Sequence, residues 1–352
     1  MGRDVTARRF DAVLRAARRT LLRVAAASLL PTLAAAPLAA QGTGWLPRLR
    51  LDNDAYNFWI HPGDRTDEEY TNGVVASLES LGAPWWGKRF GGGNPACADS
   101  RDGRGTCLTT AVSLTQDIYT PNLRRPPFSS DTWEEERPYA GWLSLGAEGR
   151  RVSHRALRTV SLAVGVTGKP SLGQAMQELA HHINSSWTVE AQGWETQVGF
   201  QPGFIAGYRH SLLAARGSAE GRGFFDLVPY AGVSVGNILT NAEVGGRARL
   251  GVNLSHPWDP RRWRQRAPWE AWLSTGGRLE HVAYNFSLDG TMPHPGRQVE
   301  RTPGVAEYEF GAGLRIHRLS LAYRAVTRSR EYATGPARFT WSSMTAGVEF
   351  FR

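Results

Sequence analysis

The chain has 352 residues and a formal net charge of +9. Seven arginines and two aspartates lie in the first 40 residues, so the rest of the chain carries only about +4. Composition therefore gives little support to nucleic-acid binding, although local basic patches can still meet phosphate groups. After residue 40, the sequence lacks the run of about 18 uncharged apolar residues that a membrane-spanning helix needs. A membrane-embedded form must then be a closed β-barrel, which leaves no backbone group unpaired in lipid.

The first 40 residues have the pattern of a signal peptide. An arginine-rich start is followed by an uncharged stretch from Val24 to Ala40 that ends in small residues. We expect cleavage near Ala40, which leaves residues 41–352 as the folded part. Arg18 and Arg19 begin a partial twin-arginine pattern, so the export route stays open. A start site chosen too far upstream also explains the long leader.

Short runs of alternating apolar and polar residues recur after the leader, separated by turn-like segments. Membrane barrels use strands of this length, with one apolar face and one that is often polar. Aromatic residues near the ends of the runs fit the interfacial girdles of such barrels; in a soluble sandwich or lipocalin-like barrel they would fill the core. The runs are residues 49–52, 74–78, 110–116, 142–149, 157–166, 197–208, 224–235, 242–252, 272–284, 305–316, 319–327 and 344–350. The sequence predicts an all-β fold, a single antiparallel transmembrane β-barrel of about 12 strands.

Four longer segments rich in proline, glycine and charge are expected to form the extended loops of one rim. They are residues 82–106, 122–136, 256–268 and 287–303. Cys97 and Cys107, the only cysteines, bracket a polar loop that starts within the first of these segments. An even pair in an exported chain predicts a disulfide, and the spacing is not that of a metal site.

One segment departs from the β pattern and predicts a short amphipathic helix over residues 174–184. At 100° per residue, Leu172, Met176, Leu179 and Ile183 fall on one stripe. His181 lies in the middle of the opposite, polar face. A lone helix with an imidazole in this position is a candidate place for chemistry, and a solvated surface helix with an idle histidine is the alternative.

Acidic residues after the first predicted strand suggest a second candidate site. Asp52, Asp54 and Asn57 offer oxygen ligands at a short spacing that suits calcium, and an Asx turn explains the same pattern. Glu68 and Glu69 stand in a further acidic group, which we interpret as a solvated loop.

Several polar motifs stand at the ends of the predicted strands. They are Asn53-Asp54, residues 66–73, residues 116–121 and residues 137–142, then Gly173, Gln177 and His181 of the helix, Gly193-Trp194, Gln197 and residues 326–332. Each motif alone is a strand end with turn residues. In this order they resemble the outer-membrane lipid A 3′-O-deacylase family, and the resemblance spans essentially the whole mature chain.

This resemblance implies a twelve-stranded outer-membrane barrel with its active site between the barrel wall and a short helix. It also implies calcium-dependent hydrolysis that removes the 3′-linked acyloxyacyl group of lipid A, the substrate carried by lipopolysaccharide. By resemblance, the family histidine is His181 and the asparagine–aspartate pair is Asn53 and Asp54. The strand hydroxyl residue is Thr71, and the helix glutamine is Gln177.

Substrate-binding residues are expected at Arg124, Arg125 and Tyr139, with an arginine meeting a lipid A phosphate or sugar. The chain departs from the family at residues 67–70, where members commonly carry Asp-Arg-Tyr-Tyr. It also ends on Arg352, whereas outer-membrane barrels usually end on an aromatic residue.

The chemistry of these residue types agrees with ester hydrolysis. His181 can act as the general base if it is neutral near pH 7, which its ordinary pKa permits. Asp54 can orient that imidazole or hold Ca²⁺ as a Lewis acid, and Asn53 can donate to the oxyanion. Residues 232–236 satisfy the G-x-S-x-G pattern, but they lie within a predicted strand and no helix follows, so we interpret the match as a coincidence. Without a plausible serine nucleophile, we expect direct attack by water.

Two other functions remain open from the sequence. One is a passive channel or surface-binding barrel that keeps the shell without the activity. The other is an outer-membrane phospholipase that activates water in a similar way. Acyl-chain specificity and the oligomeric state are not encoded in any pattern that we find.

Overall fold

The structure is a computed structural model that describes residues 44–57, 69–81, 94–97, 105–121, 135–183, 193–292 and 294–350. Within these ranges, the side chains of residues 55, 180–183, 264 and 265 are not described. The expected signal peptide, residues 1–40, lies outside the described residues, and its cleavage stays a prediction. None of the helices in the described part of the chain is long and apolar enough to cross a membrane.

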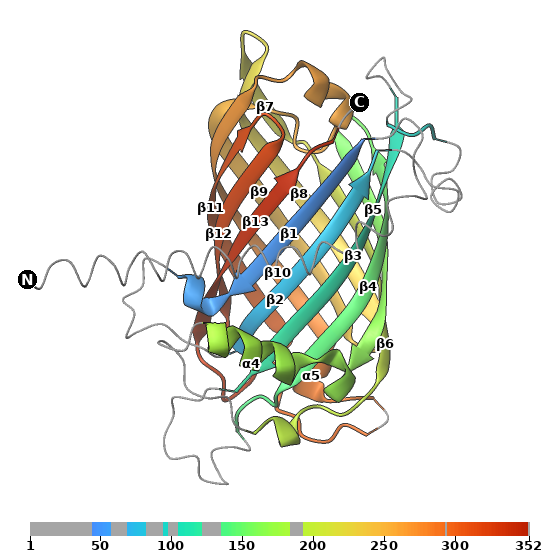
Figure 1. Ribbon diagram of the computed structural model, residues 1–352, viewed down its shortest axis with the longest axis vertical. Helices are drawn as coiled ribbons and strands as arrows, with labels where there is room; N and C mark the ends of the chain where they lie inside the picture. Colours follow the sequence, from blue (N-terminus) through green and yellow to red (C-terminus); the bar gives the residue numbers. More distant parts are fainter. Residues whose placement is uncertain are drawn as a thin grey trace, which may run out of the picture. The chain divides into compact units, whose positions relative to one another are not determined.

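The described residues fold into an antiparallel β-barrel (Figure 1). The strands are β1 (Trp45–Asn53), β2 (Glu69–Ser80), β3 (Cys107–Thr120), β4 (Ala140–Val152), β5 (Ala156–Thr167), β6 (Pro202–Leu212), β7 (Ala215–Ala219), β8 (Arg222–Gly236), β9 (Leu239–Leu254), β10 (Trp269–Asn285), β11 (Gly304–Ile316), β12 (Leu319–Ser329) and β13 (Arg338–Val348). The helices are α4 (Gly173–Ile183) and α5 (Phe286–Asp289), with 3₁₀ turns η2 (Asp54–Tyr56), η4 (Lys169–Ser171), η5 (Trp194–Thr196) and η6 (Pro260–Gln265).

Thirteen strands are assigned, but they occupy only twelve positions around the barrel wall. We call each of these positions a stave. β1 pairs with β13, which joins the first and last strands. β6 and β7 both pair with β8, β6 along its second half and β7 along its first. They form one stave that is interrupted at Leu213 and Ala214. Each of the twelve predicted runs overlaps a different stave, so the predicted fold and strand number are confirmed.

The barrel wall is apolar on its outer face and charged on its inner face. On β5, alternate side chains such as Leu162 and Val164 are exposed on the outside. The lumen holds ion pairs between strands, for example Arg249 to Asp226 at 2.6 Å. This arrangement is typical of membrane barrels and is the reverse of a soluble barrel with an apolar interior.

The expected grouping of the four long segments on one rim is wrong. Successive antiparallel strands are joined at alternate ends of the barrel, so the connections 81–106 and 255–268 lie at one end and 121–139 and 286–303 at the other. We call these the termini end, which holds Trp45 and Phe350, and the α4 end. Composition marks a segment as a loop but carries no information about which end it occupies.

The predicted disulfide between Cys97 and Cys107 is confirmed, with Cα atoms 4.8 Å apart. Its sulfur atoms pack at the termini end in a small buried cluster with Val152, Leu213 and Trp258.

His256, in the connection between β9 and β10, is buried as a neutral imidazole. Its Nε2 lies 3.0 Å from the His154 carbonyl, and its Nδ1 accepts the Asp259 N–H at 3.1 Å. A carbonyl can only accept and an N–H can only donate, so the ring carries its proton on Nε2. A second proton, on Nδ1, would point at the Asp259 N–H, which is itself a donor, so the charged form of the ring is disfavoured. Burial lowers the pKa of His256 to about 3, against the opposing effect of Asp259.

We expect this histidine to make the barrel less stable in acid. The pKa of His256 in the folded barrel lies below the value of about 6.5 that it has in an unfolded chain. Its contribution to the free energy of unfolding is therefore present above pH 6.5 and is lost as the pH falls from about 6.5 towards 3. The midpoint of heat-modifiability on gels, followed between pH 7 and 4, measures the loss. His256→Gln should flatten that dependence, whereas an unchanged slope in this variant would contradict the assignment.

Candidate active site

A β-bulge near the α4 end of β2 changes the direction of its side chains. Tyr70 pairs with Tyr119 and Asn72 pairs with Ile118, so Thr71 is an extra residue on this strand. Tyr70 lies on the lumen side, where its hydroxyl donates to Asp117 at 3.0 Å. Thr71 is buried on the outer side, with its Oγ1 2.5 Å from Oγ1 of Thr120. The bulge therefore aims a hydroxyl at the outside of the barrel wall, as bulges beside active sites often do.

Asn53 and Asp54 lie beside this hydroxyl at the end of β1. The Asn53 side-chain amide donates to the Thr71 carbonyl at 2.9 Å. Asp54 opens η2 and is buried, and its carbonyl accepts the Asn57 amide at 2.8 Å. The structure thus brings Asn53, Asp54 and Thr71 together, as the resemblance predicts.

Two of the three oxygen ligands that the sequence suggested for calcium point elsewhere. Asp52 lies on the lumen side of the wall, where it accepts the Tyr70 hydroxyl at 3.0 Å and pairs with Arg50 at 3.2 Å. The Asn57 side-chain oxygen accepts the Ser342 hydroxyl at 2.6 Å. Among the described residues, no group of three or more His, Cys, Asp and Glu side chains is arranged to hold a metal ion. The carboxylate of Asp54 is the remaining candidate from that set.

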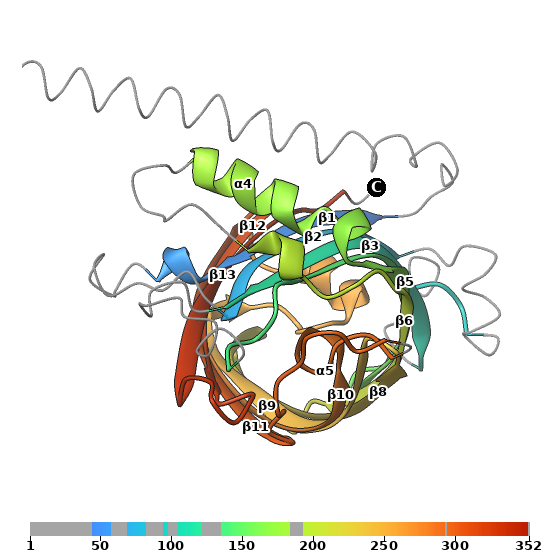
Figure 2. The ribbon, with the colours of Figure 1, turned by 90° about the horizontal axis from the view of Figure 1, so that it is seen from below.

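Helix α4 lies outside the barrel wall, against β3 and β4 (Figure 2). Its orientation is the opposite of that in a soluble protein. Gln177 is only 1% exposed, whereas Leu172 and Leu179 are 54% and 43% exposed. The side of the helix that carries Gln177 is therefore turned to the barrel, whereas Gln174 and Glu178 of the polar face are exposed and Met176 of the apolar stripe is partly buried against the wall cluster. The sequence left open a surface helix whose polar face is exposed to solvent, and at Gln177 that alternative is wrong.

Two glycines let α4 approach the wall closely. A Cβ atom on Gly173 would lie 2.8 Å from the Trp194 ring, and one on Gly141 of β4 would lie 2.1 Å from Oγ of Ser171. The turn η4 is also held to the wall, since the Gln116 amide donates to the Ser171 carbonyl at 2.7 Å. The start of the helix is thereby fixed to the outer surface of β3 and β4.

Gln177 is oriented by the indole of Trp194, whose Nε1–H donates to its Oε1 at 2.7 Å. An indole N–H can only donate, so this contact fixes which end of the amide is the oxygen. Nε2 of Gln177 is buried and has no hydrogen-bond partner among the described residues. Tyr139 packs on the other side of this pair, with its ring 4.7 Å from that of Trp194. Tyr139 has no exposed surface and supports the helix through Trp194, and its role in substrate binding stays a prediction.

The remaining predicted site residues are only partly covered by the structure. His181 lies in α4, one helical turn after Gln177, and its side chain is not described. Arg124 and Arg125 lie outside the described residues, so their role in substrate binding stays a prediction. Ser234 of the G-x-S-x-G match lies inside β8, paired with Asn241 of β9, which confirms that the match is not a nucleophile elbow.

Comparison with known proteins identifies the family. A family model described as outer membrane protein LpxR matches residues 21–350. The chain belongs to the LpxR family of outer membrane proteins. The family predicted from the order of the motifs is thereby confirmed, and so is the location in the outer membrane. No curated protein sequence matches the chain.

Solved structures agree with the LpxR family at the level of the fold. LpxR from Salmonella typhimurium is 18% identical, and it superimposes with a TM-score of 0.67 over 88% of this chain and 100% of that chain. The β-domain of the Bordetella autotransporter BrkA is 11% identical, with a TM-score of 0.40 over 88% of this chain and 98% of its own. The translocator domain of the autotransporter NalP from Neisseria meningitidis is 10% identical, with a TM-score of 0.36 over 96% of this chain and 97% of its own. We draw no argument from these two.

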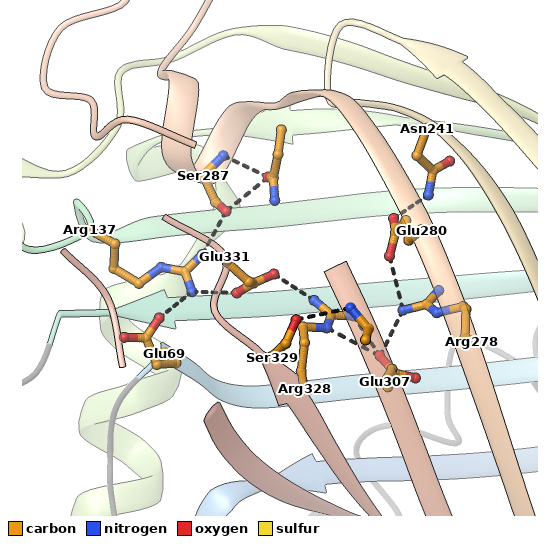
Figure 3. Close-up of polar contacts among 12 residues, drawn as sticks. Glu69, Arg137, Asn241, Arg278, Glu280, Ser287, Glu307, Arg328, Ser329 and Glu331 are labelled. Carbon is orange, nitrogen blue, oxygen red and sulfur yellow. Dashed lines mark hydrogen bonds and ion pairs between the residues drawn. The ribbon is translucent and has the colours of Figure 1, made fainter. Parts of the chain in front are cut away.

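A buried ion-pair network lies directly inside this wall of the LpxR-family barrel (Figure 3). Arg137 is fully buried and donates to Glu69 at 2.9 Å, to Glu331 at 3.2 Å and to Ser287 at 2.9 Å. Burial acts to raise the pKa of Glu331, but Arg328 and Arg137 outweigh it and hold that pKa below its ordinary value. The interpretation of Glu69 as part of a solvated loop is wrong, because this carboxylate is 1% exposed and paired.

Sequence reasoning missed the role of this network. Arg137 and Glu331 stand within motifs that resemble the LpxR family, yet nothing in their local pattern indicates that they meet. Glu69 is 68 residues from Arg137 in the sequence, and Glu331 is 194 residues from it. The one available signal was that Glu69 replaces a residue that is commonly aromatic in the family.

Proposed function

We propose that this chain is a lipid A deacylase that hydrolyses the 3′-linked acyloxyacyl ester in the outer membrane. The single observation that carries the proposal is the burial of Gln177 where α4 packs on the outside of β3 and β4, on the same outer surface that carries the buried Thr71 and Thr120 hydroxyls. Polar groups on a lipid-facing wall, beneath a helix with exposed apolar residues such as Leu179, are suited to a substrate with acyl chains. Membership of the LpxR family supports the same activity.

In the proposed mechanism, water attacks the ester carbonyl without an acyl-enzyme. Helical periodicity places residue 181 on the same face of α4 as Gln177, so we assign His181 as the general base that takes the proton of the attacking water. Gln177 Nε2 is a donor already fixed in direction, and we assign it to the developing oxyanion. Thr71 and Asn53 hold the strand ends in register next to the scissile ester.

Calcium dependence is part of the proposal. Asp54 is buried and directly follows Asn53, whose side chain contacts Thr71, and carboxylate, amide and hydroxyl oxygens are ligands of the kind that Ca²⁺ prefers. These residues therefore fit the ion, which would polarise the ester carbonyl when bound.

The α4 end is assigned to the outer surface, where lipid A resides. The longest connection between strands, residues 168–201, lies at this end, and both described ends of the barrel chain lie at the other. Outer-membrane barrels have longer loops outside and shorter turns on the periplasmic side.

Mass spectrometry of lipid A tests the function. Cells that express the protein should lose the 3′-linked chain in calcium-replete medium, and a chelator should prevent the loss. An unchanged spectrum with a folded barrel would favour a passive barrel. Release of fatty acid from purified glycerophospholipid in place of lipid A would favour the phospholipase.

Gln177→Glu is expected to lower kcat by about 100-fold with little change in KM. The variant keeps an oxygen for the Trp194 indole but loses the Nε2 donor, so the packing of α4 is retained while the oxyanion contact is removed. Gln174→Glu is the matched control, because this residue is exposed on the same helix. Initial rates on lipid A in mixed micelles measure both. Equal rates for the two variants would contradict the role of Gln177.

A further inference from the structure

The lumen contains a cavity in which arginine is the most frequent lining residue, and we call it the arginine chamber. It has a volume of about 540 Å³ and is lined by seven arginines and two glutamates. Four of the arginines, Arg48 and Arg50 of β1, Arg247 of β9 and Arg324 of β12, come from strands spread around the wall. The chamber reaches towards the termini end, where Arg266 and Glu349 also line it.

The water-facing surface of this chamber is guanidinium, although many carboxylates are nearby. The side chains of Arg48, Arg50 and Arg247 are 40–48% exposed, whereas their partners Glu79, Asp52 and Glu309 are only 3–11% exposed. The carboxylates are covered by the arginines that they bind. A molecule in the lumen therefore meets positive charge.

Most of these carboxylates are also shared between two arginines. Glu309 accepts from Arg247 at 2.6 Å and from Arg324 at 2.9 Å. Glu79 pairs with Arg150 at 2.8 Å and with Arg48 at 3.4 Å. The Arg247–Arg324 pair is thus only half neutralised by Glu309, whereas Arg150 has a second carboxylate partner in Glu148. Enclosed walls of low dielectric focus the remaining field into the cavity.

We propose that the arginine chamber binds a small phosphorylated anion. Several guanidinium forks converging on one cavity match the paired oxygens of phosphate, which a single ammonium or amide does not. The volume lies in the range of ordinary small-molecule sites. The site is separate from the deacylase site, because α4 lies outside the wall (Figure 2), whereas the chamber is lined by residues that face the lumen. Because Arg266 and Glu349 line the chamber near the termini end, we assign that end as the side of entry.

Titration of the full protein in detergent micelles tests the proposal. The probes are inorganic phosphate and pyrophosphate, compared with sodium chloride at equal ionic strength by isothermal titration calorimetry. We expect saturable binding of the phosphate probes and none of chloride. The absence of saturable phosphate binding, or an equal response to chloride, would overturn the proposal.

Single variants locate the site without leaving a carboxylate unpaired. Arg247→Gln leaves Glu309 with Arg324, and Arg48→Gln leaves Glu79 with Arg150. Each should weaken phosphate binding by about tenfold. Arg158→Gln removes the same charge from the exposed outer face of β5 and should not change binding.

Deacylation of lipid A should be unchanged in all three variants, which separates this proposal from the function proposed for the outer site. Equal weakening by Arg158→Gln would mean that only net charge matters and would overturn the chamber as the site. If a variant loses its heat-modifiable fold, the comparison of phosphate with chloride on the unaltered protein decides.

Discussion

Replacement of His181 by glutamine is expected to lower kcat for lipid A deacylation by about 1,000-fold with little change in KM. A positioned base contributes about 10²- to 10⁴-fold to such reactions, and glutamine retains the size and polarity of the side chain without a proton-accepting nitrogen. Residue 181 follows the buried Gln177 by one turn of α4, so helical periodicity predicts that His181 is directed to the same side. Mass spectrometry of lipid A after timed incubation measures the rate.

His182→Gln is the matched control for this experiment. Residue 182 lies about 100° further around the same helix, so the same substitution is placed outside the proposed site. It should leave the rate unchanged. Both variants should still migrate as folded, heat-modifiable barrels, which excludes an effect on insertion. Retained activity in His181→Gln, or equal losses in the two variants, would remove His181 as the base.

The strand pattern was predictable because its cause is local. Side chains alternate between lipid and lumen with a period of two residues, and every stave carries that alternation in its own sequence. The disulfide was predictable for a similar reason, since Cys97 and Cys107 are the only pair available. The assignment of the long loops to one rim failed because it needs the order of strands in space, which no single segment contains.

The orientation of α4 was not predictable from its periodicity. In water, the apolar stripe of a helix packs inward. Here the outer surface of the wall faces lipid, so Leu172 and Leu179 are stable on the outside while Gln177 is turned to the wall. Thr71 illustrates a second limit. Its outward direction depends on a bulge, and one extra residue in a strand leaves the alternation of its neighbours almost unchanged.

Glu69 connects the lumen network to the candidate site through the backbone. Its φ is 68°, in the left-handed region, and it stands two residues before Thr71, where the bulge begins. The Arg137 guanidinium holds one carboxylate oxygen at 2.9 Å, and the Tyr332 hydroxyl donates to the other at 2.8 Å. A side chain held at both oxygens can keep its own backbone in a strained conformation. We therefore expect the network to influence the position of Thr71 through this backbone.

Glu69→Ala should therefore lower the free energy of unfolding by about 3 kcal/mol, because Arg137 loses one of its two buried carboxylates. Glu69→Gly should be about 1 kcal/mol more stable than the alanine variant, since glycine adopts a positive φ without strain. Deacylation should follow the same order, with glycine faster than alanine, because the direction of Thr71 depends on this backbone. Urea unfolding in lipid vesicles and initial rates on lipid A measure the two effects.

Glu195→Ala provides the control, since Glu195 is exposed at the same end of the barrel and should have almost no effect on either measurement. If the alanine and glycine variants were equally stable and equally active, the ion pair would act only on packing in the lumen, and the link from Glu69 to the bulge would be lost. If glycine restored activity more than stability, the backbone at residue 69 would be the main route by which the lumen network sets the geometry of the outer site.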